Sequence, residues 1–170
     1  MKMIAGRMPG ILTLLLISCA VFTACGPSSK ITTAAATGEI AAAIDSSNWV
    51  FIPNQVTPQY GRSRSVTSDF IITYNRNKIN VYLPYYGRAR AGADVLSGKA
   101  PLDFISQNFT IDTQHPKPGE WNIMISPKDH SEVQSMNFTL FDNGSAGLDV
   151  IMNNRSGIHF DGNVAPGNKL

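Results

Sequence analysis

Arginines and tyrosines cluster in one stretch of the chain, and these residues have the clearest capacity to bind a ligand. In "VYLPYYGRARAG", residues 81–92, a β-branched run meets a proline, two tyrosines, a glycine and two arginines. A guanidinium group donates hydrogen bonds in a fork that matches carboxylate and phosphate oxygens, and aromatic rings commonly line ligand sites. We therefore predict a site for a carboxylate, phosphate or sugar-acid group, formed by Arg62, Arg64, Tyr85, Tyr86, Arg88 and Arg90.

A purely structural interpretation of the same residues stays open. The tyrosines could cover one end of a hydrophobic core, with Gly87 permitting a sharp bend beside them. The arginines could then be neutralised by carboxylates, because residues 26–99 carry eight bases and four acids whereas residues 100–170 carry four bases and eight acids. In this alternative the two parts of the chain pair their charges across a sheet.

Catalytic and metal-binding patterns are thin in this sequence. The three histidines are His115, His130 and His159, and the predicted topology puts the first two at opposite ends of the fold. Asp129-His130-Ser131-Glu132 has metal-capable residue types, but adjacent side chains in a loop diverge. A hydrolase would require His130 to meet a carboxylate in a cleft. We predict a non-catalytic protein without a metal or cofactor.

The N-terminus has the features of an export signal. Lys2 and Arg7 precede an apolar run over residues 11–21 that is shorter than the ~20 residues a membrane-spanning helix needs. Phe22-Thr23-Ala24-Cys25 fits a bacterial lipobox, which predicts a signal peptide over residues 1–24 and palmitate-type acylation of Cys25. Cys19 is the competing position, and an ordinary secretory signal is the other alternative. Cys25 is preferred because the chain becomes polar directly after it.

Lipidation sets the expected location and partners. A lipid on Cys25 anchors a protein to a membrane without spanning it, so we predict a cell-envelope protein on the outer membrane, facing the periplasm. Removal of the signal takes two basic residues away and leaves twelve bases against twelve acids. This neutral balance gives no reason to expect a nucleic-acid partner.

Two kinds of local pattern follow the signal. Residues 25–47 are predicted to form a lipidated tether and a short helix, because this segment is rich in alanine and places Ile40 and Ile44 four residues apart. From Asn48 onward the apolar residues alternate, which is typical of half-buried strands. Residues 48–170 are therefore predicted to form a β domain.

The alternation predicts eight strands. They include a long strand over Phe104–Ile111 with a bulge near Ile105, and a hairpin turn at Asp142-Asn143-Gly144-Ser145. We predict a mainly β fold: a single antiparallel meander that closes into a small barrel or a strongly curved sheet. In a meander alternate loops fall at the same end, which gathers the long links 53–66 and 84–101 with 127–132 and 153–157.

Residues 51–89 resemble a known family. The matching segments are Pro53-Asn54, Val66-Thr67-Ser68-Asp69-Phe70 and Leu83-Pro84-Tyr85-Tyr86-Gly87-Arg88-Ala89. They are similar to the domain of unknown function 4251 family of Bacteroidetes lipoproteins, and the resemblance implies an envelope lipoprotein. It implies no activity, because the family has none assigned.

Two functions are compatible with these features. The first is non-catalytic binding of a small or polymeric anionic envelope ligand, such as a glycan, at the arginine-rich end. The alternative is an interaction or scaffolding subunit of an envelope protein complex, which would use an exposed edge strand or the tyrosines as its contact surface.

Overall fold

The structure, a computed structural model, describes residues 30–90 and 100–168. The predicted signal peptide over residues 1–24 and the lipidation site Cys25 lie outside the described residues. A compact unit spans Thr33–Leu170. In the part of the chain that is described, no helix combines the length and hydrophobicity needed to cross a membrane.

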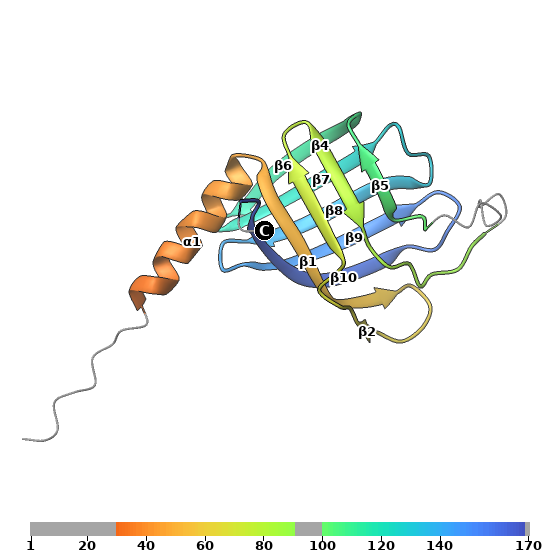
Figure 1. Ribbon diagram of the computed structural model, residues 1–170, viewed down its shortest axis with the longest axis horizontal. Coiled ribbons are helices and arrows are strands. Elements are labelled where there is room, and N and C mark those ends of the chain that lie inside the picture. The colour runs from red at the N-terminus through yellow and green to blue at the C-terminus, as the bar shows by residue number, and fades with distance from the viewer. Residues whose placement is uncertain (1–29, 91–99, 169–170) are drawn as a thin grey trace, which may run out of the picture. The chain divides into compact units, whose positions relative to one another are not determined.

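Antiparallel strands curl into a half-barrel (Figure 1). In chain order the elements are α1 (Lys30–Asp45), β1 (Asn48–Pro58), β2 (Arg64–Ser65), β3 (Ile71–Asn75), β4 (Lys78–Tyr82), β5 (Asp103–Ser106), β6 (Phe109–Lys117), β7 (Glu120–Pro127), β8 (Val133–Phe141), β9 (Ser145–Met152) and β10 (Ile158–Pro166). The predicted mainly β fold with one short helix is confirmed.

The strand order shows how the sheet curls. It is β5-β4-β3-β1-β10-β9-β8-β7-β6, and β2 pairs with β1 outside this path. The first and last long strands, β1 and β10, are neighbours, as they are when a meander closes on itself. The strands left at the two edges are β5 and β6, which follow one another in the chain.

A sharp corner separates β5 from β6, where we predicted one bulged strand. The chain leaves the ladder at Gln107-Asn108, two residues after Ile105, so the prediction of a bulge in a continuous strand was wrong. The Asp129 carboxylate holds this corner: it accepts hydrogen bonds from Ser106 Oγ (2.5 Å) and from the backbone N–H groups of Gln107 (3.1 Å) and Asn108 (3.2 Å). The corner lets one chain segment pair with β4 and then with β7.

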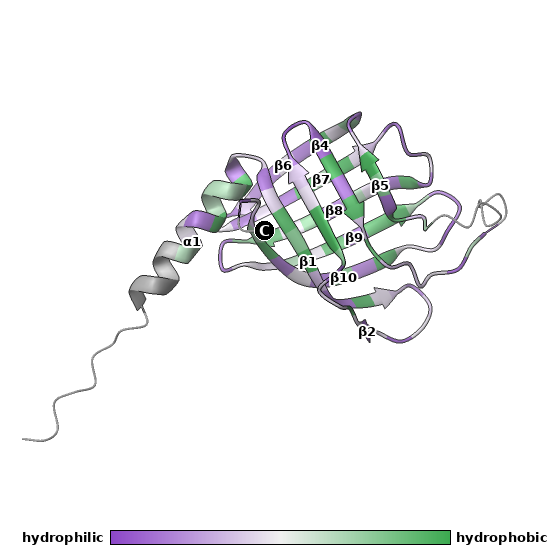
Figure 2. Ribbon diagram, in the orientation of Figure 1, coloured by the Kyte–Doolittle hydropathy of each residue, from purple (hydrophilic) through white to green (hydrophobic). Residues whose placement is uncertain are grey.

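The hydrophobic core fills the concave side of the sheet. Its largest buried side chains include Trp49, Phe51, Phe138 and Phe160, which come from β1, β8 and β10. Figure 2 shows the hydrophobic residues recurring along the strands, with hydrophilic residues at the turns. The alternation in the sequence therefore corresponds to one buried face.

Helix α1 packs against this core by its C-terminal half. Ile44 is buried in the core and Ile40 packs against it, as their spacing predicted. The helix ends at Asp45, and Ser47 just beyond it has a positive φ of 57°, which is typical of the residue that follows a helix C-terminus. Trp121 Nε1 on β7 donates a hydrogen bond to Asp45 Oδ1 (2.8 Å), which ties the end of the helix to the sheet.

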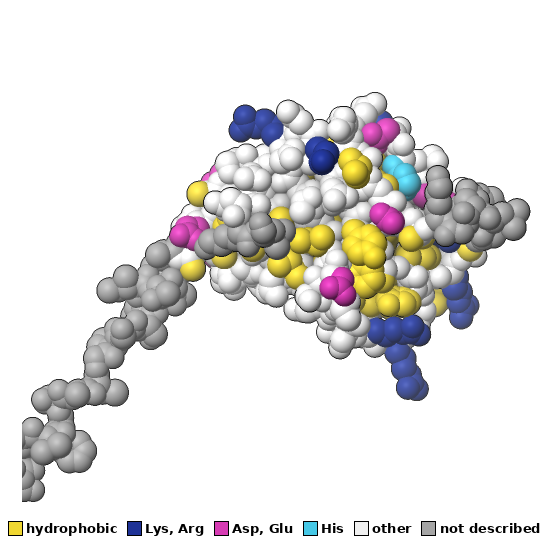
Figure 3. Space-filling model, viewed as in Figure 1, with side chains coloured by type: hydrophobic (Ala, Val, Ile, Leu, Met, Phe, Trp, Pro, Cys, Tyr) yellow, Lys and Arg dark blue, Asp and Glu magenta, His cyan; other side chains and the backbone are white. Residues whose placement is uncertain are grey.

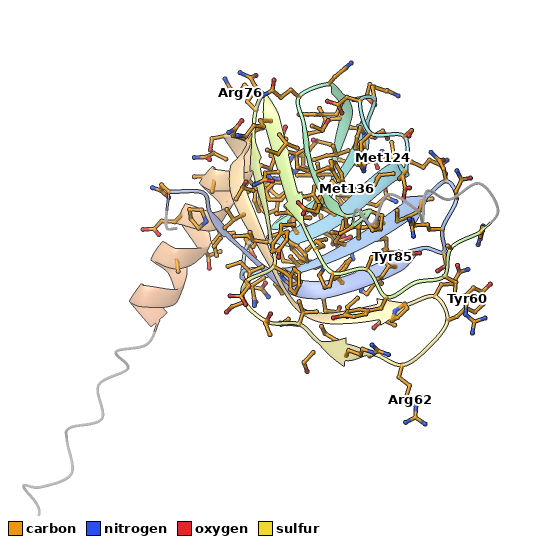
Figure 4. All side chains as sticks on the ribbon, turned by 45° about the vertical axis from the view of Figure 1, so that its right-hand side comes forward. Tyr60, Arg62, Arg76, Tyr85, Met124 and Met136 are labelled. Carbon is orange, nitrogen blue, oxygen red and sulfur yellow. The ribbon has the colours of Figure 1, made fainter. Side chains whose placement is uncertain are left out.

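Because neighbouring strands are antiparallel, the loops lie at two opposite ends of the sheet. The turns after β3, β6 and β8 lie at the end that carries α1, whereas the links after β1, β4, β7 and β9 lie at the opposite end. Figure 4 shows the separation: Arg76 lies on the first set of turns, and Tyr60 and Arg62 lie on the second. We call the end of the sheet that carries the links after β1, β4, β7 and β9 the loop end.

Candidate ligand-binding site

Two loops with the same local sequence face each other at the loop end. The pattern Tyr-Gly-Arg-x-Arg occurs at residues 60–64 and again at residues 86–90. The Arg64 guanidinium lies over the Tyr86 ring, 4.9 Å from its centroid, and the Arg88 guanidinium lies over the Tyr60 ring at 5.4 Å. Each loop thus contributes one arginine and one tyrosine to a pair of reciprocal cation–π stacks, which we call the outer stacks.

The first loop is held by a short ladder. Strand β2 pairs with β1, with Arg64 opposite Val56. Val66 N donates to Asn54 O (2.9 Å), and the hydroxyls of Thr57 and Ser63 are 2.8 Å apart. Asn54 lies where the register of β1 against β10 shifts, so the bulge in β1 provides the carbonyl that secures the loop.

The second loop is held by Ser156, which is buried between β9 and β10. Tyr85 Oη donates to Ser156 O (2.8 Å), and Arg88 N donates to Ser156 Oγ (2.8 Å). Ser156 N donates to Arg88 O (2.9 Å), and Arg90 N donates to Asn154 O (2.8 Å). Tyr85 therefore turns into the body of the protein, whereas its neighbour Tyr86 is 42% exposed.

Gly87 is required by close packing and not by an unusual backbone conformation. The chain bends at Gly87, as we predicted, but the φ of Gly87 is not among the positive values of the described glycines. A Cβ at this position would collide with the Tyr85 hydroxyl and with Ser156 Oγ. Glycine lets the loop approach Ser156 closely enough for the three backbone and hydroxyl bonds to form.

A third arginine lies over a tyrosine beneath the two loops. The Arg155 guanidinium is 5.6 Å from the Tyr85 ring centroid, and its Nε donates to Glu132 Oε2 at 2.6 Å. Arg155 is buried at 8% exposure. Because its charge is compensated and enclosed, we assign this inner stack to the structure of the loop end.

Within the described residues, carboxylates do not neutralise the other arginines of the loop end. There, the lysine and arginine ion pairs with carboxylates are Arg155–Glu132 and Lys117–Glu120, both inside the second half of the chain. Arg62, Arg64, Arg88 and Arg90 are exposed and have no carboxylate within 4.0 Å among the residues described. The alternative in which the two halves neutralise each other is therefore wrong for this part of the chain.

The predicted site residues separate into three groups. Arg64, Tyr86 and Arg88 come together in the outer stacks, and Tyr85 lies beneath them. The Arg62 side chain points away from the body (Figure 4), and basic side chains project from the surface beside β2 in Figure 3. Arg90 lines an adjoining open groove of about 580 Å³, together with Thr57, Gln59, Met152 and His159.

Two residues of this arrangement, Tyr60 and Ser156, were not predicted from the sequence. Tyr60, which is 53% exposed, forms the platform under Arg88, and Ser156 anchors the second loop. The repeated Tyr-Gly-Arg-x-Arg pattern was a signal that could have identified Tyr60. Ser156 has no comparable signal, because its role depends on where the turn between β9 and β10 meets the second loop.

His130 and His159 are each engaged by neighbouring side chains. His130 stacks on Phe104 with ring centroids 4.0 Å apart, and its neighbour Asp129 is engaged at the corner before β6. His159 lies on the outer face of the sheet between two carboxylates, with Nδ1 2.7 Å from Asp149 Oδ1 and Nε2 3.3 Å from Asp161 Oδ1. Residues 30–90 and 100–168 contain no group of three or more potential ligands that could hold a metal ion.

These features define a class of protein: a curled antiparallel sheet, capped at one end by a helix, that presents arginines and tyrosines on the loops of the other end. The chain belongs to the DUF4251 family, because the model of this domain of unknown function matches residues 32–164. The family resemblance seen in the sequence is thus confirmed.

A solved structure agrees with this assignment. The chain is similar in fold to the crystal structure of a DUF4251 family protein from Bacteroides eggerthii DSM 20697, with a TM-score of 0.60 and 18% sequence identity. The likeness covers 82% of this chain and 93% of that one. No protein in the curated comparison matches the chain.

Proposed function

We propose that this protein is a lipid-anchored envelope protein that binds an anionic ligand, without catalysis, through its outer stacks. The ligand carries carboxylate or phosphate groups and is a small molecule or a glycan. The observation that carries the proposal is the state of Arg64 and Arg88: both are held over tyrosine rings, exposed, and without a carboxylate partner among the described residues.

Stacking prepares a guanidinium for anion binding. The tyrosine ring holds the guanidinium through a cation–π contact and supplies no carboxylate to neutralise it. Each donor fork therefore stays available for a bidentate hydrogen-bonded pair with a carboxylate or phosphate. Because the stack also restricts the long side chain, less rotamer entropy is lost when the ligand binds.

Two neighbouring forks favour a ligand with more than one anionic group. Each loop places its arginine over the tyrosine of the other loop, so Arg64 and Arg88 lie on the same local surface as the exposed rings of Tyr60 and Tyr86. A chain of acidic sugars supplies repeated carboxylates together with apolar ring faces that can contact tyrosine. An acidic glycan is therefore the ligand class that this surface fits best.

Calorimetric titration with a uronic-acid tetrasaccharide at low ionic strength tests the site. Replacing Arg64 and Arg88 together by Gln is expected to weaken binding about a hundredfold, since each charged hydrogen-bond pair contributes about 1.4 kcal/mol. Arg76→Gln, at the opposite end, is the matched control and should bind like the unmodified protein. A neutral glucose tetrasaccharide should not bind.

Two results would overturn the assignment. Equal affinity of the uronic-acid tetrasaccharide for the double variant and the unmodified protein would place the site elsewhere. Absence of saturable binding by the uronic-acid tetrasaccharide and by inorganic pyrophosphate would remove anion binding altogether. The double variant should keep its melting temperature within a few degrees, because exposed cation–π stacks contribute only about 0.5–1 kcal/mol each.

The proposed anchor is a lipid on Cys25, which would hold the protein at the outer membrane with the β domain in the periplasm. Its support is the lipobox at residues 22–25 and the polar residues that follow. Labelling cells with a palmitate analogue should mark the unmodified protein and Cys19→Ser, and should not mark Cys25→Ser. Labelling that is lost only in Cys19→Ser would move the anchor, and no labelling of the unmodified protein would remove it.

A further inference from the structure

Strand β6 is an edge strand that projects beyond the core. It is nine residues long, stands last in the strand order and, among the strands of the described residues, pairs only with β7. Every residue of the strand after Phe109 is exposed, including Ile111 at 44%. Edge strands of this length present unpaired N–H and C=O groups that can pair with another chain.

The register identifies which backbone groups of β6 are free. Lys128 N donates to Asn108 O (2.7 Å), so the pair 108/128 is hydrogen-bonded, and bonded and non-bonded pairs alternate along an antiparallel ladder. The residues opposite Ile125 and Ile123, which are Ile111 and Thr113, therefore lie at non-bonded positions. Their N–H and C=O groups point away from β7, toward the free edge.

A slot lies beside this edge on the concave side of the sheet. Its lining comes from three places: Ile111, Thr113 and His115 on β6, Trp121 on the neighbouring β7, and Tyr74 on β3 with Asp45 and Ser47 at and just beyond the end of α1. The slot has a volume of about 250 Å³. Its walls are aromatic on two sides, since the rings of His115 and Trp121 meet edge to face at 5.6 Å and Tyr74 is almost fully buried.

The charges around β6 favour a basic partner. Asp45 brings a carboxylate to the slot at the C-terminus of α1, where the helix dipole also attracts cations. Asp112 places a second carboxylate on the other face of β6, where Gln114 Nε2 donates to it (3.1 Å). Lys117 is 3.9 Å from Glu120, which offsets its charge.

The same charges disfavour a second copy of this chain. Antiparallel pairing of two β6 strands around Thr113 would place Asp112 of each strand diagonally across the ladder from the other. Like charges in such neighbouring positions destabilise a sheet. A strand with basic residues meets carboxylates on both faces of β6 instead.

We propose that β6 accepts an extended peptide segment of a partner protein, which adds to the sheet as a strand and places a lysine or arginine in the slot beside Asp45. The backbone of the segment pairs with Ile111 and Thr113 about 4.8 Å from β6. Alternate side chains of the segment face the slot. There the aromatic rings contact the aliphatic part of the lysine or arginine side chain, and Asp45 neutralises its charge. This interaction surface is separate from the anion-binding loops at the other end.

Fluorescence anisotropy of a labelled nine-residue peptide of alternating valine and lysine tests the proposal. The peptide should bind saturably, and Thr113→Pro should weaken binding at least about tenfold, because proline removes an edge N–H that β7 does not use. Thr113→Val keeps that N–H and should bind normally. Asp45→Asn, which can still accept the Trp121 hydrogen bond, should weaken binding about threefold to tenfold.

Peptide controls keep the test independent of whether the proline variant folds. The same peptide with N-methyl groups on alternate amides, or with glutamate in place of lysine, should fail to bind the unmodified protein. Equal binding of the N-methylated and parent peptides would overturn strand addition, and so would the absence of saturable binding. A concentration-dependent dimer abolished by Thr113→Pro would instead make a second copy the occupant and overturn the basic partner.

Discussion

The inner stack and the two outer stacks at the loop end use the same pair of residue types in different surroundings. Arg155 over Tyr85 is buried, paired with Glu132 and joined to a tyrosine whose hydroxyl is bonded to Ser156. Arg64 over Tyr86 and Arg88 over Tyr60 are exposed and have no carboxylate partner among the described residues. An arginine–tyrosine contact therefore has no fixed role; burial and compensation of its charge decide what it does.

The two kinds of stack depend on each other. Ser156 follows Arg155 in the chain, and its backbone and hydroxyl hold Arg88 and Tyr85. The inner stack thus helps to position the loop that carries Tyr86 and Arg88 of the outer stacks. Substitutions in the inner stack should reduce stability, whereas substitutions in the outer stacks should reduce binding.

The largest loss of stability is expected from Arg155→Met. Methionine fills part of the space but leaves the Glu132 carboxylate, whose side chain is 20% exposed, without its partner. Breaking such a largely buried pair should lower the free energy of unfolding by about 2–3 kcal/mol. Urea denaturation measures this change.

A double variant separates charge from packing in this experiment. Glu132→Gln combined with Arg155→Met removes both charges and should recover part of the lost stability, because no unpaired carboxylate remains. A loss below about 0.5 kcal/mol for the single variant would mean that the inner stack does not support the loop end.

Gly87→Ala should have the next largest effect. Its Cβ would collide with Tyr85 and Ser156, and relief of such overpacking typically costs about 1–3 kcal/mol. The same substitution at Gly38, on α1, meets no atom within 4 Å and should stabilise the protein by about 0.5–1 kcal/mol. Thermal unfolding of the two variants compares them directly, and equal shifts would show that Gly87 is not held by close packing.

Paired tyrosine variants refine the comparison between inner and outer positions. Tyr85→Phe removes the hydroxyl that donates to Ser156 O and should cost about 1 kcal/mol, because that carbonyl is buried with its serine. Tyr86→Phe changes an exposed side chain and should stay within about 0.5 kcal/mol of the unmodified protein. Chemical denaturation of both proteins measures the difference, and a larger loss for Tyr86→Phe would reverse the assignment of the two rings.

Most of the fold follows from local features of the sequence. Alternating apolar residues and short turns specify antiparallel neighbours, and that order alone gathers the long loops at one end. The turn at residues 142–145, which joins β8 to β9, illustrates this, since Asn143 Oδ1 accepts hydrogen bonds from Ser145 N (2.9 Å) and Ser145 Oγ (2.7 Å). Local chemistry is sufficient there because every partner is near in the chain.

The missed features depend on residues far apart in the sequence. The corner before β6 needs the Asp129 carboxylate, which comes from a loop more than twenty residues later. Ser156 likewise reaches Tyr85 from a turn about seventy residues away. Periodicity reports which face of a strand is buried, but it carries no information on which distant side chain will satisfy a break in the ladder.

The smallest predicted effect is on the pH dependence of stability and comes from His159, which forms an exposed ion pair where Arg155 and Glu132 form a buried one. Partial burial lowers the pKa of His159, but hydrogen bonds to Asp149 and then Asp161 outweigh it and raise the pKa above 6.5. A raised pKa means that the protonated ring stabilises the folded state fully below pH 6.5, and that this contribution is lost as the pH rises through the folded-state pKa. Because the three side chains are substantially exposed, the contribution should be about 0.5 kcal/mol. His159→Gln should flatten the decline of stability across this pH range in urea titrations, and an unchanged pH profile would show that these carboxylates do not hold the proton.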